Sequence, residues 1–421
     1  MKKDNLKSII VLFACCLIIS LLLAAINLIT APIIKENSLK AQLAALEGLV
    51  PNADYEEKIG LENLPSSIEG IFVDKNGGGV AIVFSASSQY SSSPMQYAVG
   101  INMDGKIISI KKIVYMESKD FGNYPDSFVG KEYADIDSVD AFAGVTYSSD
   151  AFKQGLKDAY AAFYTATGGE LKKTELDVLN SLIEGTTFKM IDTEAKLSEG
   201  VTAVYRANAS TYAFSIVDGE TVTLVVSDIL GKIICAADYE SGEKIEYSAS
   251  VLSDIRAVIA SDIIGKVMTP DAQFEFVDFE PVENTVKTNI SHTGDREFTA
   301  RTVAAFQTGE GYTLLVESQG YAAVENNGEP IVIAVGFDND GKIIKTHVIS
   351  HAETQKFGGD KVINNTGYTD KYIGLDTVPE DLFSFIDGGS YATYSYTGYH
   401  NGVHTAYLAI TAIISETGGN R

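Results

Sequence analysis

One stretch of about one domain length occurs twice in this chain. The run DGKII stands at Asp104–Ile108 and again at Asp340–Ile344. Asp-Gly favours a tight turn, and the apolar residues after it favour a strand. Because further landmarks follow both runs in the same order, we interpret the stretch as an internal repeat of one folded module.

The second landmark is a Glu-x3-Phe-Gly pattern, and the third is an aspartate followed six residues later by Thr-Tyr-Ser. The first copy contains Glu117, Phe121, Gly122, Asp140, Thr146 and Ser148, and the second contains Glu353, Phe357, Gly358, Asp387, Thr393 and Ser395. After each threonine, apolar residues recur at helical spacing, so we expect each threonine to open a helix. These residues are Phe152, Leu156, Tyr160 and Phe163, matched by Tyr399, Val403, Tyr407 and Ile410.

A third, incomplete copy lies between the two. Leu230–Ile234 repeats the turn, and the apolar run Thr221–Val226 precedes it as a strand. The segment from Leu224 to Met268 contains no threonine. We therefore interpret this copy as a spacer or packing module.

The N-terminal region is apolar. No charged residue occurs from Ser8 to Ile34, which is long enough for a helix to cross a bilayer core about 30 Å thick. Lys2, Lys3 and Lys7 precede it, so the positive-inside rule predicts a single-pass cell-membrane protein with a cytoplasmic N-terminus. The bulk of the chain would then be extracytoplasmic. The alternative is a lipoprotein modified at Cys15.

The charge of the chain excludes some partners. The formal net charge is −24 at pH 7, so nucleic acid and anionic lipid are poor partners. Three cysteines, two of them in the apolar segment, exclude a disulfide framework and a cysteine-ligated iron–sulfur cluster. A redox cofactor in this chain would have to be organic.

These patterns predict an α+β fold, with an N-terminal transmembrane helix followed by repeated domains of antiparallel sheet plus helix. The expected parts are a cytoplasmic stub and transmembrane helix (1–34), a membrane-proximal helix and stalk (35–60), a first domain (61–165), a degenerate middle repeat (179–270) and a second domain (297–421).

The two Asp-x5-Thr copies resemble the attachment site of the FMN-binding domain family, found in the G subunit of the Rnf complex and the C subunit of the sodium-pumping NADH:quinone oxidoreductase. The N-terminal part, including the segment LITAPIIKENSLKAQLAAL, resembles the Rnf G subunit. The resemblance implies one or two covalent FMN groups, joined through phosphoesters to Thr146 and Thr393 by a separate flavin transferase that uses FAD. It also implies cofactor-binding roles for Asp140, Asp387, Gly144, Ser148, Ser390, Glu117, Phe121, Gly122, Glu353, Phe357 and Gly358.

Both copies depart from the family pattern of Ser or Thr, Gly, Ala and Thr. The first reads AGVT up to Thr146 and the second reads SYAT up to Thr393, with Tyr391 where the family has glycine.

Alternatives stay open for several of these residues. The two aspartates either fix a turn or help the transferase and its metal. Glu117 and Glu353 either bond the flavin or are solvated turn carboxylates. Phe121 and Phe357 either pack on a flavin ring or belong to the core.

His400 and His404 have the i, i+4 spacing of metal ligands. We interpret them as a polar helix face, because zinc protease chemistry needs a glutamate between them and a third ligand.

Two classes of function follow. The chain is either a flavin electron carrier or a non-redox, membrane-tethered sensor or interaction module. As a carrier it would be the electron-transfer subunit of an ion-translocating, Rnf-like membrane complex, or a stand-alone protein serving an extracellular electron acceptor.

Overall fold

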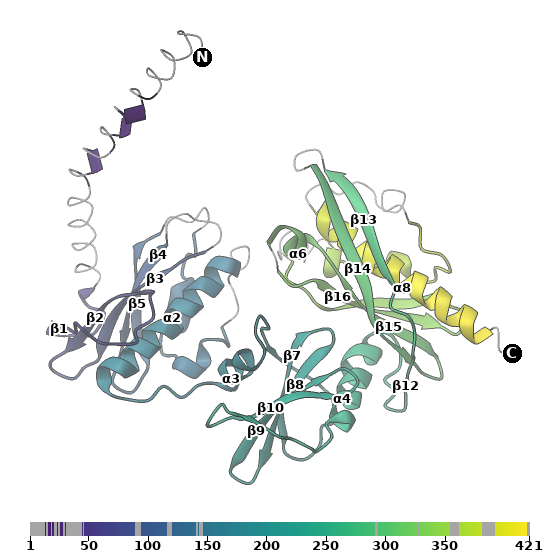
Figure 1. Ribbon diagram of the computed structural model, residues 1–421, viewed down its shortest axis with the longest axis horizontal. Coiled ribbons are helices and arrows are strands. Elements are labelled where there is room, and N and C mark those ends of the chain that lie inside the picture. The colour runs from purple at the N-terminus through teal and green to yellow at the C-terminus, as the bar shows by residue number, and fades with distance from the viewer. Residues whose placement is uncertain are drawn as a thin grey trace. The chain divides into compact units, whose positions relative to one another are not determined.

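The computed structural model describes residues 13, 16, 17, 19, 20, 23, 26, 27, 30, 44, 46–88, 94–115, 120–139, 142, 146–290, 294–326, 328–353, 362–380 and 392–418. The chain divides into two compact units, Met1–Lys172 and Lys173–Arg421, which are described separately. Figure 1 shows the elements of each unit.

The first unit is a five-stranded antiparallel sheet in the order β1-β2-β3-β4-β5. Its strands are β1 Tyr55–Glu57, β2 Ile68–Asp74, β3 Val80–Ala86, β4 Met95–Ile101 and β5 Ile107–Val114. Two short 3-10 helices, η1 Tyr124–Phe128 and η2 Tyr133–Asp135, lead to the long helix α2, Thr146–Thr167.

Both faces of this sheet are covered. Helix α2 covers one face with Phe152, Leu156 and Tyr160, at the spacing expected from the sequence. Residues 46–50 cover the other face, where Leu46 and Leu49 are packed into a second core. This explains why nearly every residue of β3 is buried, as in strands that are enclosed on two sides.

One turn occurs three times in the chain, as the DGKII and LGKII runs predict. The glycine of each turn has a left-handed φ of +81°, +81° and +84° at Gly105, Gly231 and Gly341. In each turn the side chain of an Asn or Asp accepts two backbone N–H bonds from residues two and four positions later. All three copies of the repeat therefore form the same hydrogen-bonded turn.

The second unit begins with the middle repeat. Its six-stranded antiparallel sheet consists of β6 Lys189–Ile191, β7 Val201–Asn208, β8 Thr211–Asp218, β9 Thr221–Asp228, β10 Ile233–Asp238 and β11 Lys244–Ile245. Helix α3, Glu175–Leu182, packs on one face through Val178 and Leu179. A continuous helical segment packs on the other face. It consists of α4 Leu252–Val258, the π-helix η3 Ile259–Ile264 and α5 Gly265–Val267.

This α4–η3–α5 segment is shared between two sheets. The same apolar core contains Phe214 and Val225 of the middle sheet, Ile259 and Ile263 of the helical segment, and Phe306 of the next sheet. Ile255, Ile259 and Ile263 of this segment are buried, while Ser253 is exposed and Arg256 is half-buried. The middle repeat and the C-terminal repeat are therefore joined by one continuous core.

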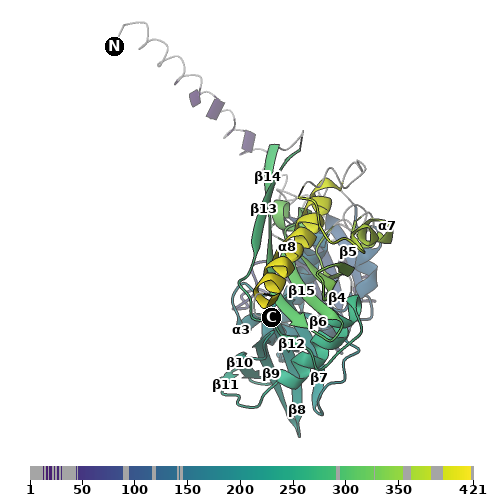
Figure 2. The same ribbon diagram turned by 90° about the vertical axis from the view of Figure 1, so that its right-hand side faces the viewer.

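The C-terminal repeat contains β12 Glu275–Phe276, β14 Gly294–Gln307, β15 Gly311–Ser318, β16 Ile331–Asp338 and β17 Ile343–Ser350, with β13 Glu283–Ile290 paired to β14. Its helices are α6 Tyr321–Asn326, α7 Thr366–Thr369, the 3-10 helix η5 Asp370–Tyr372 and α8 Thr393–Gly418. Helix α8 packs on the sheet face opposite the shared segment, through Tyr399, Val403 and Ile410. Figure 2 shows α8 along β13, β14 and β15.

The middle repeat lacks one segment that the other two repeats possess. Residues 115–145 and 351–392 connect the last long strand to the threonine helix, whereas only 239–251 separate β10 from α4. The longer connections are tied to the sheet in the same way. Ile107 N–H donates to Lys131 O at 2.9 Å, and Ile343 N–H donates to Leu375 O at 2.9 Å.

The expected N-terminal transmembrane helix was wrong as a feature of this fold. Within the part of the chain that the structure describes, no helix is both long enough and apolar enough to cross a membrane. The long helices α2 and α8 pack on sheets instead. Most of the apolar run from Ser8 to Ile34 lies outside the described residues. The architecture consists of antiparallel sheets with packed helices.

Candidate functional site

Both candidate attachment threonines begin a helix. Thr146 is the first residue of α2 and Thr393 is the first residue of α8. The first turn of a helix presents backbone N–H groups without intrahelical partners and a partial positive charge. The two positions therefore suit a phosphate group bonded to the threonine.

Glu353 connects the start of α8 to the start of α6. Its carboxylate accepts hydrogen bonds from the Ser395 hydroxyl, two residues after Thr393, and from Ala322 N–H at 3.0 Å. The side chain is only 6 % exposed. Burial raises the pKa of Glu353, and the bonds from Ser395 and Ala322 oppose that rise without cancelling it. The structure thus brings this predicted site residue to the helix that carries Thr393 and excludes the alternative of a solvated turn carboxylate.

The backbone around Glu353 is closely packed. A Cβ at Gly320 would stand 2.4 Å from Glu353 Oε1, and a Cβ at Gly398 would stand 2.4 Å from Gln319 O. Ser318 Oγ also donates to Gly398 O at 2.6 Å. Since α8 meets the β15–α6 junction without room for side chains, its N-terminal turns are held in one position.

One hydroxyl near Thr393 has no partner in the described structure. Thr397 Oγ1 is buried and makes no hydrogen bond. Thr397 lies four residues after Thr393 and therefore on the same side of α8. A buried hydroxyl without a partner calls for an explanation, and a bound water, ion or polar group can provide it.

In the first unit, the predicted residues take different positions. Ser148 is buried in the first turn of α2, and the neighbouring Ser149 hydroxyl accepts from Phe142 N–H at 3.0 Å. Phe121 is 1 % exposed and contacts the rings of Tyr124 and Phe152. Phe121 is therefore a packing residue of the aromatic core.

Gly122 adopts a left-handed φ of +54°. A Cβ at this position would meet no heavy atom within 4 Å, so the glycine serves the turn rather than a close approach.

The two histidines of α8 are buried, which the sequence pattern did not indicate. His400 is 3 % exposed, and its Nε2 lies 2.8 Å from Pro379 O while its Nδ1 lies 2.9 Å from Tyr372 Oη. A carbonyl can only accept, so Nε2 carries a proton and donates it to Pro379 O. The ring fastens Tyr372 and Pro379, which precede α8 in the chain, to that helix.

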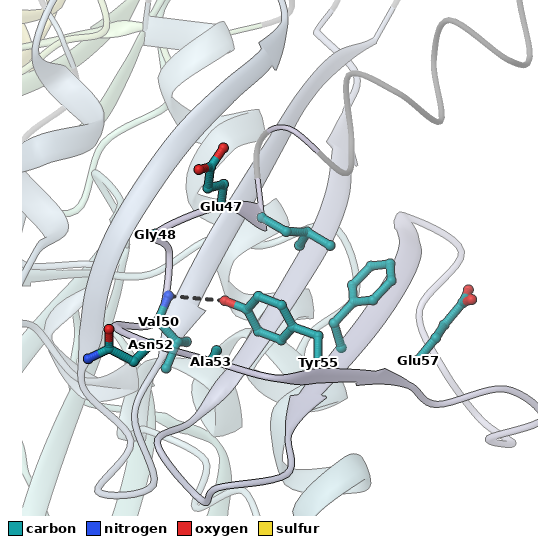
Figure 3. Close-up of a pocket in the computed structure, with 9 residues that line it drawn as sticks. Glu47, Gly48, Val50, Asn52, Ala53, Tyr55 and Glu57 are labelled. Atoms are coloured by element: carbon teal, nitrogen blue, oxygen red, sulfur yellow. Dashed lines mark hydrogen bonds between the residues drawn. The ribbon is translucent and has the colours of Figure 1, made fainter.

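Two hollows lie away from the threonines. A hollow of about 680 Å³ in the first unit includes Leu46, Tyr55 and Phe72, on the sheet face opposite α2, and Figure 3 shows Tyr55 Oη bonded to Val50 N–H. A smaller one of about 250 Å³ lies in the second unit, where Lys189 pairs with Glu329 beside His351. Neither is lined by a predicted site residue.

Seven predicted site residues lie outside the described residues: Glu117, Asp140, Gly144, Phe357, Gly358, Asp387 and Ser390. Their cofactor-binding roles stay predictions.

Comparison with known proteins gives two separate matches to one family, the FMN-binding domain, at residues 90–161 and 327–408. Two segments of this chain resemble FMN-binding domains. The first match contains Thr146 and the second contains Thr393. The resemblance expected from the sequence is confirmed, and the middle repeat lies between the two matches.

A relative from Clostridium ljungdahlii, the G subunit of the proton-translocating ferredoxin:NAD(+) oxidoreductase complex, is 25 % identical over 170 residues. The alignment covers 37 % of this chain and 89 % of that relative. Together with the FMN-binding domain matches, it supports the coarser prediction of an FMN-binding electron-transfer flavoprotein.

The described residues fit FMN at the start of α8. The N-terminal turn of a helix suits the phosphate, and Thr397 and the Glu353–Ser395 pair offer polar atoms near Thr393. Sequence reasoning gave Glu353 a cofactor-binding role, named Ser395 only as part of the Thr-Tyr-Ser landmark, and omitted Thr397 and α6. Ser395 occupies the same place in its Thr-Tyr-Ser run as Ser148 does in the first copy, and this equivalence could have indicated its role. No pattern in the repeat points to α6.

Proposed function

We propose that this chain is an electron-transfer flavoprotein in which Thr146 and Thr393 each carry FMN through a phosphoester. The observation that carries the proposal is that each FMN-binding domain match includes one candidate attachment threonine, Thr146 or Thr393, and most of the helix that this threonine begins. The N-terminal backbone N–H groups of α2 and α8 would hold the phosphate. FMN supplies one- and two-electron transfer when bound.

A threonine hydroxyl is a weak nucleophile without an adjacent base. The proposal therefore includes a separate flavin transferase that uses FAD as donor, with this chain as its substrate. Glu353 and Ser395 would keep the first turn of α8 in the conformation that presents Thr393.

For partners, we propose the membrane redox subunits of a complex similar to the one to which the Clostridium ljungdahlii relative belongs. Proton translocation takes place across a membrane, so the flavin domains would work at its surface, on the extracytoplasmic side. A stand-alone carrier for an extracellular acceptor is the second candidate. It is favoured by the large part of this chain that the relative does not cover.

Intact mass spectrometry of protein produced with the transferase tests the attachment. We expect two FMN additions in the native chain, one in Thr146→Ala, one in Thr393→Ala and none in the double variant. Thr165→Ala, at an exposed position of α2, is the matched control and should keep both. FMN on the double variant would overturn the assignment. A colourless native chain would favour the sensor class, and protease added to spheroplasts tests the side of the membrane.

A further inference from the structure

An exposed aromatic side chain stands beside the start of α8 and belongs to neither repeated motif. Tyr321 is the first residue of α6, and its ring centroid lies 5.9 Å from that of Tyr394, which follows Thr393. Tyr394 is buried, with Phe298 at 5.3 Å on another side. Tyr321 is 38 % exposed. Figure 1 shows α6 beside the N-terminal end of α8.

The position of Tyr321 is fixed through its backbone. Its own N–H and that of Ala322 donate to the Glu353 carboxylate, which also accepts from Ser395 on α8. Gly320, directly before Tyr321, has no room for a side chain because of Glu353. The exposed ring is therefore held on a rigid support beside the attachment helix.

We propose that the ring of Tyr321 packs against the isoalloxazine of the FMN carried by Thr393. This inference rests on the proposed function. A flat aromatic cofactor gains from offset or edge contacts with an aromatic side chain, and such a side chain serves best when it is fixed in advance. Tyr321 has an open face for this contact, whereas Phe121, the aromatic residue of the repeated motif in the first unit, is enclosed in its core.

The contact has a spectroscopic signature. A phenol in contact with an excited flavin donates an electron to it and recovers the electron afterwards, so fluorescence is quenched with no net oxidation or reduction. A phenylalanine ring packs in the same way but is a far weaker electron donor. Packing and quenching can therefore be measured separately.

The experiment uses the full chain with Thr146→Ala, so that FMN is present only at Thr393. In this background we expect Tyr321→Ala to lose the short-lived fluorescence component and to change the visible circular dichroism of the flavin. Tyr321→Phe should lose the short-lived component but keep the visible circular dichroism. Intact mass confirms FMN in each variant, and far-ultraviolet circular dichroism confirms the fold.

The matched control places Tyr321→Ala in the Thr393→Ala background, where FMN is present only at Thr146. Its fluorescence lifetime should not change. The inference is overturned if Tyr321→Ala carries FMN at Thr393 with an unchanged lifetime and unchanged visible circular dichroism, or if the control changes. If the Thr146→Ala parent carries no FMN at all, the proposed attachment at Thr393 has failed, and the inference fails with it.

Discussion

Val267 lies directly against Gly336, and a Cβ at Gly336 would stand 3.1 Å from the Cβ of Val267. Gly100 has the same relation to residues 46–50 of the first unit, since a Cβ there would stand 2.6 Å from Leu49 O. Both glycines lie in the strand before the repeated turn, β4 in one repeat and β16 in the other. The shared segment α4–η3–α5 thus covers one face of the C-terminal sheet, as residues 46–50 cover one face of the sheet in the first unit.

Gly336→Val should destabilise the second unit. The added side chain must displace Val267, and overpacking of a close interface costs about 1–3 kcal/mol. The free energy of urea-induced unfolding of the full chain measures this effect. Gly309→Ala is the control, because its Cβ would meet no heavy atom within 4 Å and should leave stability nearly unchanged. Equal stability of the two variants would contradict the close packing.

A fragment of residues 271–421 should fail to fold, whereas residues 173–421 should fold. Without the shared segment, Ala304, Phe306 and Leu315 would lose the apolar partners that bury them. Size-exclusion chromatography and thermal unfolding compare the two fragments. A soluble 271–421 fragment with cooperative unfolding would show that the C-terminal sheet does not need the middle repeat.

Glu353→Gln should flatten the pH dependence of stability in the second unit. Because burial raises the pKa of Glu353 in the folded state, its contribution is fully present below about pH 4.3, the usual value for glutamate, and is lost as pH rises through the folded pKa. The variant removes this loss. Unfolding midpoints measured from acidic to neutral pH test it, and a parallel curve for variant and native protein would refute the shifted pKa.

As the pH falls, the free energy of unfolding of the second unit should decrease before that of the first unit. Burial lowers the pKa of His347, His351 and His404, so the folded unit binds fewer protons than the unfolded chain. Its stability is then present above about pH 6.5 and falls as pH drops through the folded pKa values. Hydrogen exchange of the full chain reports each unit separately. The first unit contains none of the five histidines, so earlier loss of its protection would contradict this assignment.

Local patterns predicted much of this structure correctly. The Asp-Gly and Leu-Gly runs form the same turn three times, and the apolar spacing after Thr146 and Thr393 forms helices with those residues inside. Such features depend on neighbouring residues alone. The antiparallel strands around the turns follow from the same signals.

Features that depend on distant residues could not be predicted. The residues around Ile259 are mostly apolar, which indicates a packed helix but does not say that two different sheets bury it. The contact between Glu353 and Ser395 spans 42 positions in sequence, and the burial of His400 depends on Tyr372 and Pro379. The length of the apolar run Ser8–Ile34 led to an expected membrane helix that the described fold does not contain.

The shared helical segment also bears on how such a chain can change in evolution. Once the middle repeat supplies the helix on which the C-terminal sheet rests, losing that repeat would expose the core of its neighbour. A copy without an attachment threonine is then retained for its helix, independent of any cofactor. In a lineage descended from this chain, we expect substitutions to accumulate on the outer strands β6 and β11 sooner than at Ile259, Ile263 or Val267.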